Sequence, residues 1–427
     1  MADVRRAVRE ALASLPERPQ GPVPDVASVP ARSTPPARPA QGSPPAPPAP
    51  AAQGTSPTPL APIPATAPLV LVALSGGPDS LALAIATAFE APRAGFRAGA
   101  VVVDHDLQAE SAAVAEHAAG QARDLGLDPV VVIRVRVDPS SPDGPEAAAR
   151  AARYAAFDDA LRASAAAATP AAATPAETTP AETAPAETVP AETVPAETAP
   201  AETVPAETAT APTAPAAAAL AAPGASRILL GHTLDDQAET VLLGLARGSG
   251  PSSLSGMDAV NGVFVRPLLG IRRQIVHRSV TDAGLVAWND PQNLDPAYKR
   301  VRVRETVLPM LESELGPGIA EALARTADQL REDDEALDAL AAEWAAEIVE
   351  HAEAGIAVDV HGLASNPPAL AQRIVRFVVA SEFGVSLSRT QTLAALRLVT
   401  EWHGQNGVDL PGIHVARTGA QLVFARR

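Results

Sequence analysis

The stretch Leu69-Val-Leu-Val-Ala-Leu74 runs directly into Ser75-Gly-Gly-Pro-Asp-Ser80, which is followed by the alanine-rich run from Leu81 to Ala88. The first run is apolar and unbroken, which predicts a buried strand, and the third has the composition of a helix. The glycines and the proline between them predict a tight loop. Because this loop opens a helix, its backbone N–H groups and the positive end of the helix dipole would attract an anion.

The side chains of this loop are also suited to phosphate. Gly76 and Gly77 lack a Cβ and let the backbone approach an anion closely, while Ser75 and Ser80 supply hydroxyls. Asp79 would repel a phosphate unless a cation lay between them, so the loop also predicts Mg²⁺. The Gly-Lys-Ser/Thr ending of a Walker A loop is missing. An ordinary strand-to-helix turn is the alternative interpretation.

Length and composition limit the class of protein. The chain has 427 residues, no cysteine and a formal net charge of −16. This length allows two hydrophobic cores, and the absence of cysteine excludes a disulfide framework and thiolate chemistry. We find no secretory leader and no apolar run long enough to cross a bilayer, so we expect a cytoplasmic protein without membrane contact.

Composition divides the chain into segments. Residues 1–16 predict a short amphipathic helix ended by a proline, and residues 17–67 predict a disordered linker rich in proline and alanine. Residues 68–308 are expected to form the main domain, interrupted at 164–224 by a low-complexity insertion with seven copies of Pro-Ala-Glu-Thr-x. Residues 309–427 are expected to form a smaller, mostly helical domain that ends in a β-hairpin about Thr418-Gly419.

The main domain alternates between strand and helix patterns. Further strands are predicted at 99–103, 130–135 and 227–230, with helices at 111–125 and 146–161 between them. This alternation predicts the α/β class, with a parallel sheet covered by helices on both faces. Ligands of such sheets bind outside the carboxyl ends of the strands.

Acidic residues follow two of these strand ends. Asp104-His105 ends the second strand, and Asp235-Asp236 opens a helix after the last one. Asp235 and Glu239 are spaced i,i+4 and therefore share a helix face. An acidic first turn that stabilises the helix is the simpler interpretation of this pair. A second acidic cluster at the same sheet edge as Asp79 favours a metal site instead.

Two charged runs follow. The basic stretch Lys299-Arg-Val-Arg-Val-Arg304 is either the solvated face of a strand or a set of phosphate contacts, for which arginine is well suited. The run Arg331–Glu335 is interpreted as solvated surface. The apolar face of the surrounding helix is predicted to comprise Leu323, Ala327, Leu330, Leu337, Leu340, Trp344 and Ile348.

Taken in order, these segments resemble the tRNA(Ile)-lysidine synthases, a branch of the N-type ATP pyrophosphatases. The resemblance covers most of residues 69–309 outside the repeats. The family usually continues Val-Asp-His with Gly-Leu-Arg, where this chain has Asp106-Leu-Gln108, and its Arg-Asn-x-Ile-Arg appears as Arg300-Val-Arg-Val-Arg304. The segments that carry the resemblance are Ser75–Ser80, Val103–His105, Ala149-Arg150 with Arg153-Tyr154, Gly231–Thr240, Arg247–Gly250, Arg266–Leu269, Asp290–Asn293 and Arg300–Arg304.

The resemblance implies a two-step reaction on the wobble cytidine of an isoleucine tRNA with a CAU anticodon. ATP adenylates the cytidine O2, and the ε-amine of free L-lysine then displaces AMP. It implies ATP binding by Ser75, Gly76, Gly77, Pro78, Asp79, Ser80, Asp104, His105 and His232, and Mg²⁺ binding by Asp79 and Asp236. Arg150 and Arg153 are candidates to stabilise the adenylyl transition state, Asp235 and Glu239 to receive the lysine ammonium, and Arg247, Arg300, Arg302 and Arg304 to contact tRNA.

Two alternatives remain open at this point. One is another ATP pyrophosphatase such as an ammonia-dependent NAD synthetase, and the other is a non-catalytic nucleotide- or RNA-binding relative. The sequence leaves the oligomeric state undetermined, with a homodimer among the options.

Overall fold

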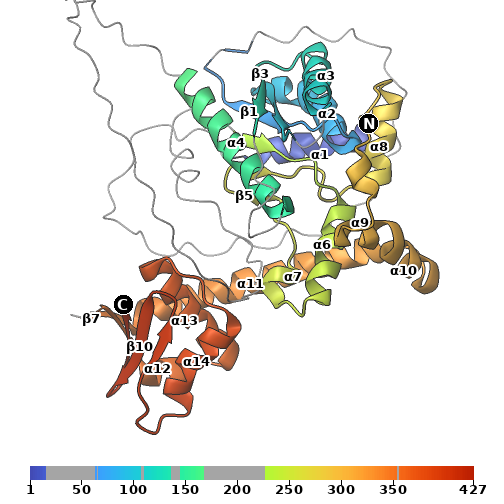
Figure 1. The fold of residues 1–427 in the computed structure, drawn as a ribbon. Coiled ribbons are helices and arrows are strands. Elements are labelled where there is room, and N and C mark those ends of the chain that lie inside the picture. The colour runs from blue at the N-terminus through green and yellow to red at the C-terminus, as the bar shows by residue number, and fades with distance from the viewer. Residues whose placement is uncertain (16–62, 65, 107–109, 136–144, 168–226, 353–354) are drawn as a thin grey trace, which may run out of the picture. The chain divides into compact units, whose positions relative to one another are not determined.

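The computed structural model describes residues 1–15, 63–64, 66–106, 110–135, 145–167, 227–352 and 355–427 (Figure 1). The predicted linker, apart from its last few residues, and the Pro-Ala-Glu-Thr-x repeats lie outside these residues. The chain forms two compact units, the first comprising 1–233 and 259–294 and the second 234–258 and 295–427. These units follow contacts in space, and the division of the chain at residue 309 stays a prediction.

The first unit is built on a six-stranded sheet with the order β3-β2-β1-β4-β6-β5. All neighbours pair in parallel except β5 and β6, which are antiparallel. β1 lies at the centre because its apolar residues are covered on both faces. The strands are β1 (Leu69–Ala73), β2 (Arg97–Asp104), β3 (Val130–Arg134), β4 (Arg227–Leu229), β5 (Val260–Asn261) and β6 (Phe264–Val265).

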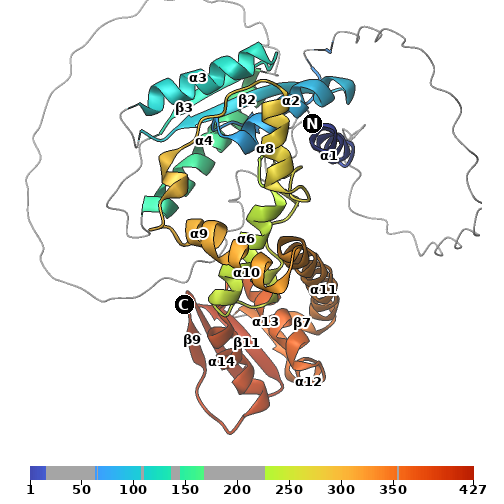
Figure 2. The same ribbon diagram turned by 90° about the vertical axis from the view of Figure 1, so that its right-hand side faces the viewer.

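Helices cover both faces of this sheet, which confirms the predicted class. Val70 and Val72 point to the face packed by α1 (Ala2–Ala13), α2 (Pro78–Arg93), α3 (Ser111–Asp124) and α8 (Arg273–Asp282). Leu69 and Leu71 point to the other face, where they pack against α4 (Pro145–Ala167). Figure 2 shows α3 and α4 on opposite sides of the sheet.

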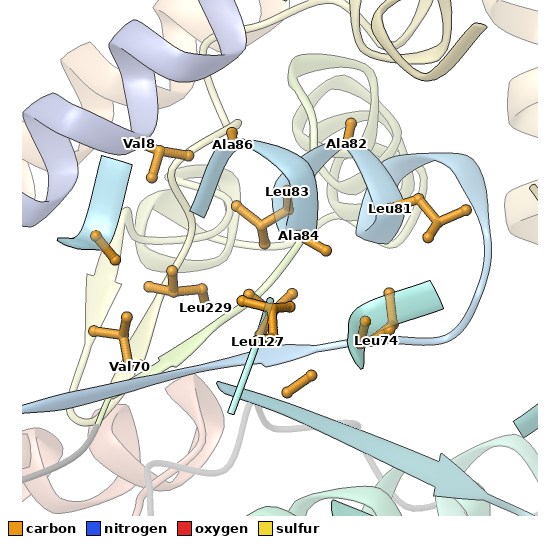
Figure 3. Packing of buried hydrophobic residues seen from close by; sticks show 14 of the residues in the cluster. Val8, Val70, Leu74, Leu81, Ala82, Leu83, Ala84, Ala86, Leu127 and Leu229 are labelled. Carbon is orange, nitrogen blue, oxygen red and sulfur yellow. The ribbon is translucent and has the colours of Figure 1, made fainter. Parts of the chain in front are cut away.

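The core beneath α2 holds the loop of residues 75–80 in place. Figure 3 shows Leu83 of α2 above Val70 and Leu229 of the sheet, with Val8 of α1 beside Ala86. Every one of these side chains is fully buried. The predicted N-terminal helix is therefore confirmed, and it packs on α2 through its apolar face.

The second unit joins helices to an antiparallel sheet. Its sheet has the order β7-β8-β11-β10-β9, and the predicted terminal hairpin is confirmed by the pairing of Thr418 with Gln421. Its strands are β7 (Val349–Ala352), β8 (Gly355–Asp359), β9 (Val408–Leu410), β10 (Ile413–Thr418) and β11 (Gln421–Arg426). Its helices are α6 (Leu234–Ala246), α7 (Pro251–Leu254), α9 (Lys299–Arg302), α10 (Leu308–Leu315), α11 (Ile319–Ile348), α12 (Val360–Ala364), α13 (Pro368–Phe383) and α14 (Arg389–Thr400).

The face that α11 buries matches the predicted one in part. Ala327 and Ile348 are buried as predicted, and Leu323 and Trp344 are half-buried against the cores. Leu340 is 45% exposed, whereas a line of alanines is buried: Ala320, Ala324, Ala327, Ala341 and Ala345. α11 packs on α6 and α13. Small side chains let these helices approach closely, which is why alanines form the fully buried line while Leu340 is left exposed.

The charge run on α11 is solvated surface only in part: Glu332, Asp333 and Glu335 are exposed, whereas Arg331 and Asp334 are half-buried and paired. Arg331 donates hydrogen bonds to Asp258 and to the carbonyl oxygens of Ser255 and Met257. Asp334 pairs with Arg373 of α13, whose side chain is only 8% exposed. Because these partners lie on distant segments of sequence, the local charge pattern could not reveal them.

Candidate active site

The loop between β1 and α2 closes on itself through its two serines. Ser80 Oγ donates to the carbonyl oxygen of Gly77 at 2.9 Å and accepts the backbone N–H of Ser75 at 3.2 Å. Ser75 Oγ lies 3.2 Å from Ser80 Oγ. The two hydroxyls therefore hold the turn in shape as well as offering polar groups to a ligand.

Two glycines are required by the geometry around this loop. Gly76 has a φ of +79°, and its carbonyl oxygen accepts the N–H of Trp288 at 2.9 Å. At Gly231, a Cβ would lie 3.1 Å from the backbone carbon and oxygen of Asp79 and 3.2 Å from the nitrogen of Ser80. The end of β4 therefore packs directly on the first turn of α2 with no room for a side chain.

The N-terminus of α2 has no side-chain cap. The helix begins with Pro78, and its N-cap is Gly77, which has no side chain to satisfy the first N–H groups. These groups and the helix dipole favour a negatively charged ligand. The phosphate-binding role of this loop stays a prediction, and its uncapped helix N-terminus is compatible with it.

Asp79 faces two basic side chains that sequence reasoning missed. Its Oδ1 lies 3.2 Å from Nε2 of His277, and its Oδ2 lies 4.0 Å from Nε of Arg273. Both residues are on α8, four positions apart, so they share one face of that helix. The i,i+4 spacing was a visible signal, but nothing local in the sequence connects α8 with residue 79.

The donor set at Asp79 fits Mg²⁺ only in combination with a substrate. Within the described residues, no three His, Cys, Asp or Glu side chains gather closely enough to hold a metal. Asp79 Oδ1 is buried and has no hydrogen-bond partner, so a hard oxygen ligand is present there. Mg²⁺ commonly takes one or two carboxylates together with substrate phosphates, which matches a single carboxylate beside a phosphate loop.

The end of β2 forms a second polar group in the same unit. Asp104 is 4% exposed, and its Oδ1 accepts the N–H of Asp106 at 3.0 Å. Arg134 of β3 contacts both carboxylates, at 3.6 Å from Asp104. Asp106 has a φ of +53°, a conformation that glycine adopts readily and aspartate tolerates. Asp106, which stands where the family usually has glycine, can therefore adopt the backbone conformation of the same turn.

His105 and Arg153 meet although 48 positions separate them in sequence. Nε of Arg153, on α4, donates to Nε2 of His105 at 3.3 Å. This contact needs a neutral imidazole, and burial, reinforced by the charge of Arg153, lowers the pKa of His105 despite the opposing effect of Asp104. Arg150 lies one turn earlier, 5.2 Å from the ring centre of Tyr154. The structure thus brings together two predicted site residues from separate elements.

In the second unit, the acidic turn of α6 is paired with the basic stretch. Arg304 binds Glu239 through two hydrogen bonds of 2.7 and 3.0 Å and Asp236 through one of 3.3 Å. Glu239 is completely buried, and Arg300 lies 3.7 Å from it and 3.3 Å from Thr240 Oγ1. The two outer arginines therefore contact α6.

The basic stretch is helical, which overturns its interpretation as a strand. It forms α9 and the π-helical turn η2 (Val303–Val307). Arg302 is exposed on this segment and donates to the carbonyl oxygens of Pro296 and Ala297. A helix aligns residues four apart, which is why Arg300 and Arg304 reach the same carboxylate.

The remaining predicted residues lie near the start and end of α6. Asp235 is on its first turn, and Arg247 is exposed just after its last residue. His232 precedes the helix in the first unit, and Asp79 belongs to that unit as well. Asp236 belongs to the second unit, so the two predicted metal ligands come from different units.

Comparison with known proteins identifies the family of this chain. A family model described as a PP-loop domain matches residues 56–175 and 216–311, so the chain contains the PP-loop class of ATP-binding domain. The "tRNA(Ile)-lysidine synthase" of Leifsonia xyli is 54% identical over 84% of this chain and 90% of its own. Those of Thermobifida fusca and Streptomyces coelicolor are 44% and 43% identical, covering 82% and 84% of this chain and 89% and 86% of their own.

The chain therefore belongs to the tRNA(Ile)-lysidine synthase family, and it is an enzyme of the ligase class. Among solved structures, a U34-tRNA thiolase from Methanococcus maripaludis covers 62% of this chain and 73% of its own at 14% identity. Its TM-score of 0.39 is too low to support an inference. No helix in the described part of the chain is long and apolar enough to cross a membrane.

Proposed function

We propose that this protein ligates free L-lysine to C2 of the wobble cytidine of tRNA(Ile) with a CAU anticodon. In the first step, the cytidine O2 attacks the α-phosphorus of ATP, and pyrophosphate leaves. In the second step, the ε-amine of lysine attacks C2, and AMP leaves with the former O2 while the amine loses a proton. The product, lysidine, changes codon reading from AUG to AUA. We place this reaction in the cytoplasm.

The observation that carries the proposal is the loop at residues 75–80 in a chain of this family. Its serine-closed turn and its helix N-terminus without a side-chain cap are suited to the pyrophosphate portion of ATP. Negative charge builds up on that portion as the bond to AMP breaks. Preorganised N–H groups stabilise this charge without reorganising during the reaction.

Two further groups in the first unit support a role in adenylation. The hydrogen bond between Arg153 and His105 holds the guanidinium in one orientation. We assign Arg153 the stabilisation of charge on the α-phosphate, with Arg150 as a second cation one turn away. We assign Asp104 the ordering of the turn that follows β2 beside the nucleotide, because its carboxylate accepts the N–H of Asp106.

For the second step, Asp235 is the better candidate to receive the lysine ammonium. Glu239 is completely buried and already accepts two hydrogen bonds from Arg304. A carboxylate so engaged would have to give up these bonds before it could bind a second cation. We therefore propose that Glu239 and Arg304 position the first turn of α6, which carries Asp235 and Asp236.

Mg²⁺ and tRNA complete the proposal. We propose that Asp79 holds Mg²⁺, which when bound would neutralise charge on the leaving pyrophosphate. Among the four predicted tRNA contacts, Arg302 and Arg247 are exposed. We propose these two as the direct phosphate contacts, since exposed arginines can form bidentate bonds with phosphate.

The test is incubation of the purified protein with bulk tRNA, ATP and labelled lysine. We expect the label to enter a tRNA with a CAU anticodon, with pyrophosphate released only when tRNA is present. Release of pyrophosphate without tRNA, together with no label in tRNA, would contradict the proposal. A parallel reaction with deamido-NAD and ammonia would then show whether the protein is an NAD synthetase.

A further inference from the structure

Arg273 and His277 are two basic side chains beside the phosphate loop. Both side chains reach Asp79, the second residue of α2, from the same face of α8. The Arg273 side chain is 15% exposed, and that of His277 is 43% exposed. Each therefore remains partly open to solvent at a point where the helix N-terminus already attracts anions.

α8 has a fixed position relative to the loop. Its residues Val276 and Val280 are buried in the same hydrophobic core as Leu81 and Leu83 of α2. Ser279, between them, is completely buried as well. Since this packing belongs to the first unit alone, the distance between the two basic residues and the loop is set within that unit.

The contacts with Asp79 are electrostatic and weakly directional. The 4.0 Å separation between Arg273 Nε and Oδ2 exceeds a hydrogen bond, and Asp79 Oδ1 has no hydrogen-bond partner although His277 Nε2 is 3.2 Å away. A carboxylate that forms no hydrogen bond is a modest match for an imidazole and a helix N-terminus. A phosphate group, with more charge and several acceptor oxygens, is a better match for both and can also contact the guanidinium beside them.

We propose that Arg273 and His277 bind the pyrophosphate portion of ATP, and that pyrophosphate replaces Asp79 as their partner when the nucleotide enters. The exchange releases the Asp79 carboxylate to bind Mg²⁺ beside the same phosphates. Before substrate arrives, Asp79 faces both basic side chains. This assignment rests on the proposed function of the loop and adds α8 as a third element of the site.

Calorimetric titration of the full-length protein with inorganic pyrophosphate tests the assignment without tRNA or lysine. With Mg²⁺ present, we expect Arg273→Ala to weaken binding about tenfold or more, because a charge-assisted contact is lost. His277→Gln should weaken it less. The matched control is Arg278→Ala, which removes an exposed arginine from the same helix and should leave binding unchanged. Equal affinities for wild type and Arg273→Ala, with unchanged melting temperature, would overturn the assignment.

A second titration tests whether pyrophosphate replaces Asp79 as the partner of Arg273 and His277, or simply binds beside these two side chains while Asp79 stays in place. In metal-free buffer, we expect Asp79→Asn to bind pyrophosphate more tightly than wild type, because a competing carboxylate has been removed. With Mg²⁺ present, the same variant should bind more weakly, because it cannot hold the metal. Weaker binding under both conditions would contradict the exchange. Since lysine transfer plays no part in either titration, failure of the proposed reaction would be recognised separately.

Discussion

At the scale of single residues, Gly231 allows the end of the strand and the first turn of the helix to approach closely at the phosphate loop, because it has no side chain. Gly231→Ala would place a Cβ 3.1 Å from the backbone carbon and oxygen of Asp79. Backbone cannot move aside as the end of a side chain can, so the first turn of α2 must shift. We expect a loss of stability of about 1–3 kcal/mol and a larger relative loss of pyrophosphate release, measured by chemical denaturation and by a steady-state assay.

Gly120→Ala is the matched control for this prediction. Gly120 lies within α3 of the same unit, and a Cβ there would meet nothing within 4 Å. In a helix, alanine is favoured over glycine by about 0.5–1 kcal/mol. We expect the control to be at least as stable as wild type and fully active. If Gly231→Ala behaved in the same way, the close approach would have no functional importance.

Arg302 and Arg304 are two residues apart and are expected to respond differently to truncation. Arg304→Ala leaves the buried carboxylate of Glu239 without its main partner, and we expect destabilisation of about 3 kcal/mol. Arg302→Ala removes an exposed side chain that contacts two backbone carbonyls, at a cost of about 1 kcal/mol or less. We expect it to raise the KM for tRNA without a similar change in the KM for ATP.

Denaturation curves and initial-rate kinetics on the two variants provide the measurement. Arg302→Lys serves as the control, because it keeps the charge while losing the planar donor group. A KM for tRNA that does not change in Arg302→Ala would contradict its assignment as a phosphate contact. A stable Arg304→Ala variant would contradict the positioning role of its contact with Glu239.

At the scale of elements, α1 is attached to α2 by charge as well as by apolar packing. Arg5 and Arg9 bind the two carboxylate oxygens of Glu90, which is 1% exposed. The hydrogen bond from Arg9, followed by that from Arg5, lowers the pKa of Glu90 below its ordinary value of 4.5 and outweighs the effect of burial. The charged carboxylate is therefore the form that the folded protein favours.

This attachment should weaken in acid. Because the pKa of Glu90 is lower in the folded state, its contribution to stability is present above pH 4.5 and is lost as the pH falls through the lowered value. Glu90→Gln should cost about 1–3 kcal/mol at neutral pH, and the difference from wild type should shrink below pH 4.5. Unfolding by denaturant at several pH values measures this difference. A difference that stayed constant down to pH 3 would contradict the lowered pKa of Glu90 and with it the stabilisation by charge.

At the scale of the whole molecule, the repeat segment is expected to be dispensable. The family model passes from residue 175 to residue 216 and leaves the seven Pro-Ala-Glu-Thr-x copies between unmatched. We predict that deleting residues 176–215 leaves kcat and melting temperature nearly unchanged. The deletion removes seven glutamates, so tRNA affinity should rise slightly at low salt and less at high salt.

The measurement is tRNA binding and turnover for the deletion variant at two ionic strengths. A variant of equal length with each repeat glutamate changed to glutamine separates charge from length. It should reproduce the change in tRNA affinity while the chain stays intact. A fall of several degrees in melting temperature on deletion would show that the segment packs against the rest of the protein.

Much of the first unit could be predicted from short stretches of sequence. The apolar run 69–74 and the glycine-rich loop after it determine a strand, a turn and a helix, because burial and backbone freedom act over a few residues. The spacing of Val4, Val8 and Leu12 likewise predicted the helix that packs on α2. These properties depend on neighbours in sequence, so the sequence alone was a sufficient guide.

The tertiary structure alone decided which charges meet. The pairs of Asp79 with His277, His105 with Arg153 and Glu239 with Arg304 join residues 48 to 198 positions apart. The free energy of such a pair depends on distance and burial, and local patterns report neither. For the same reason the sequence determined the chemical types of residue at this site, whereas only the folded chain determined which arginine contacts which carboxylate.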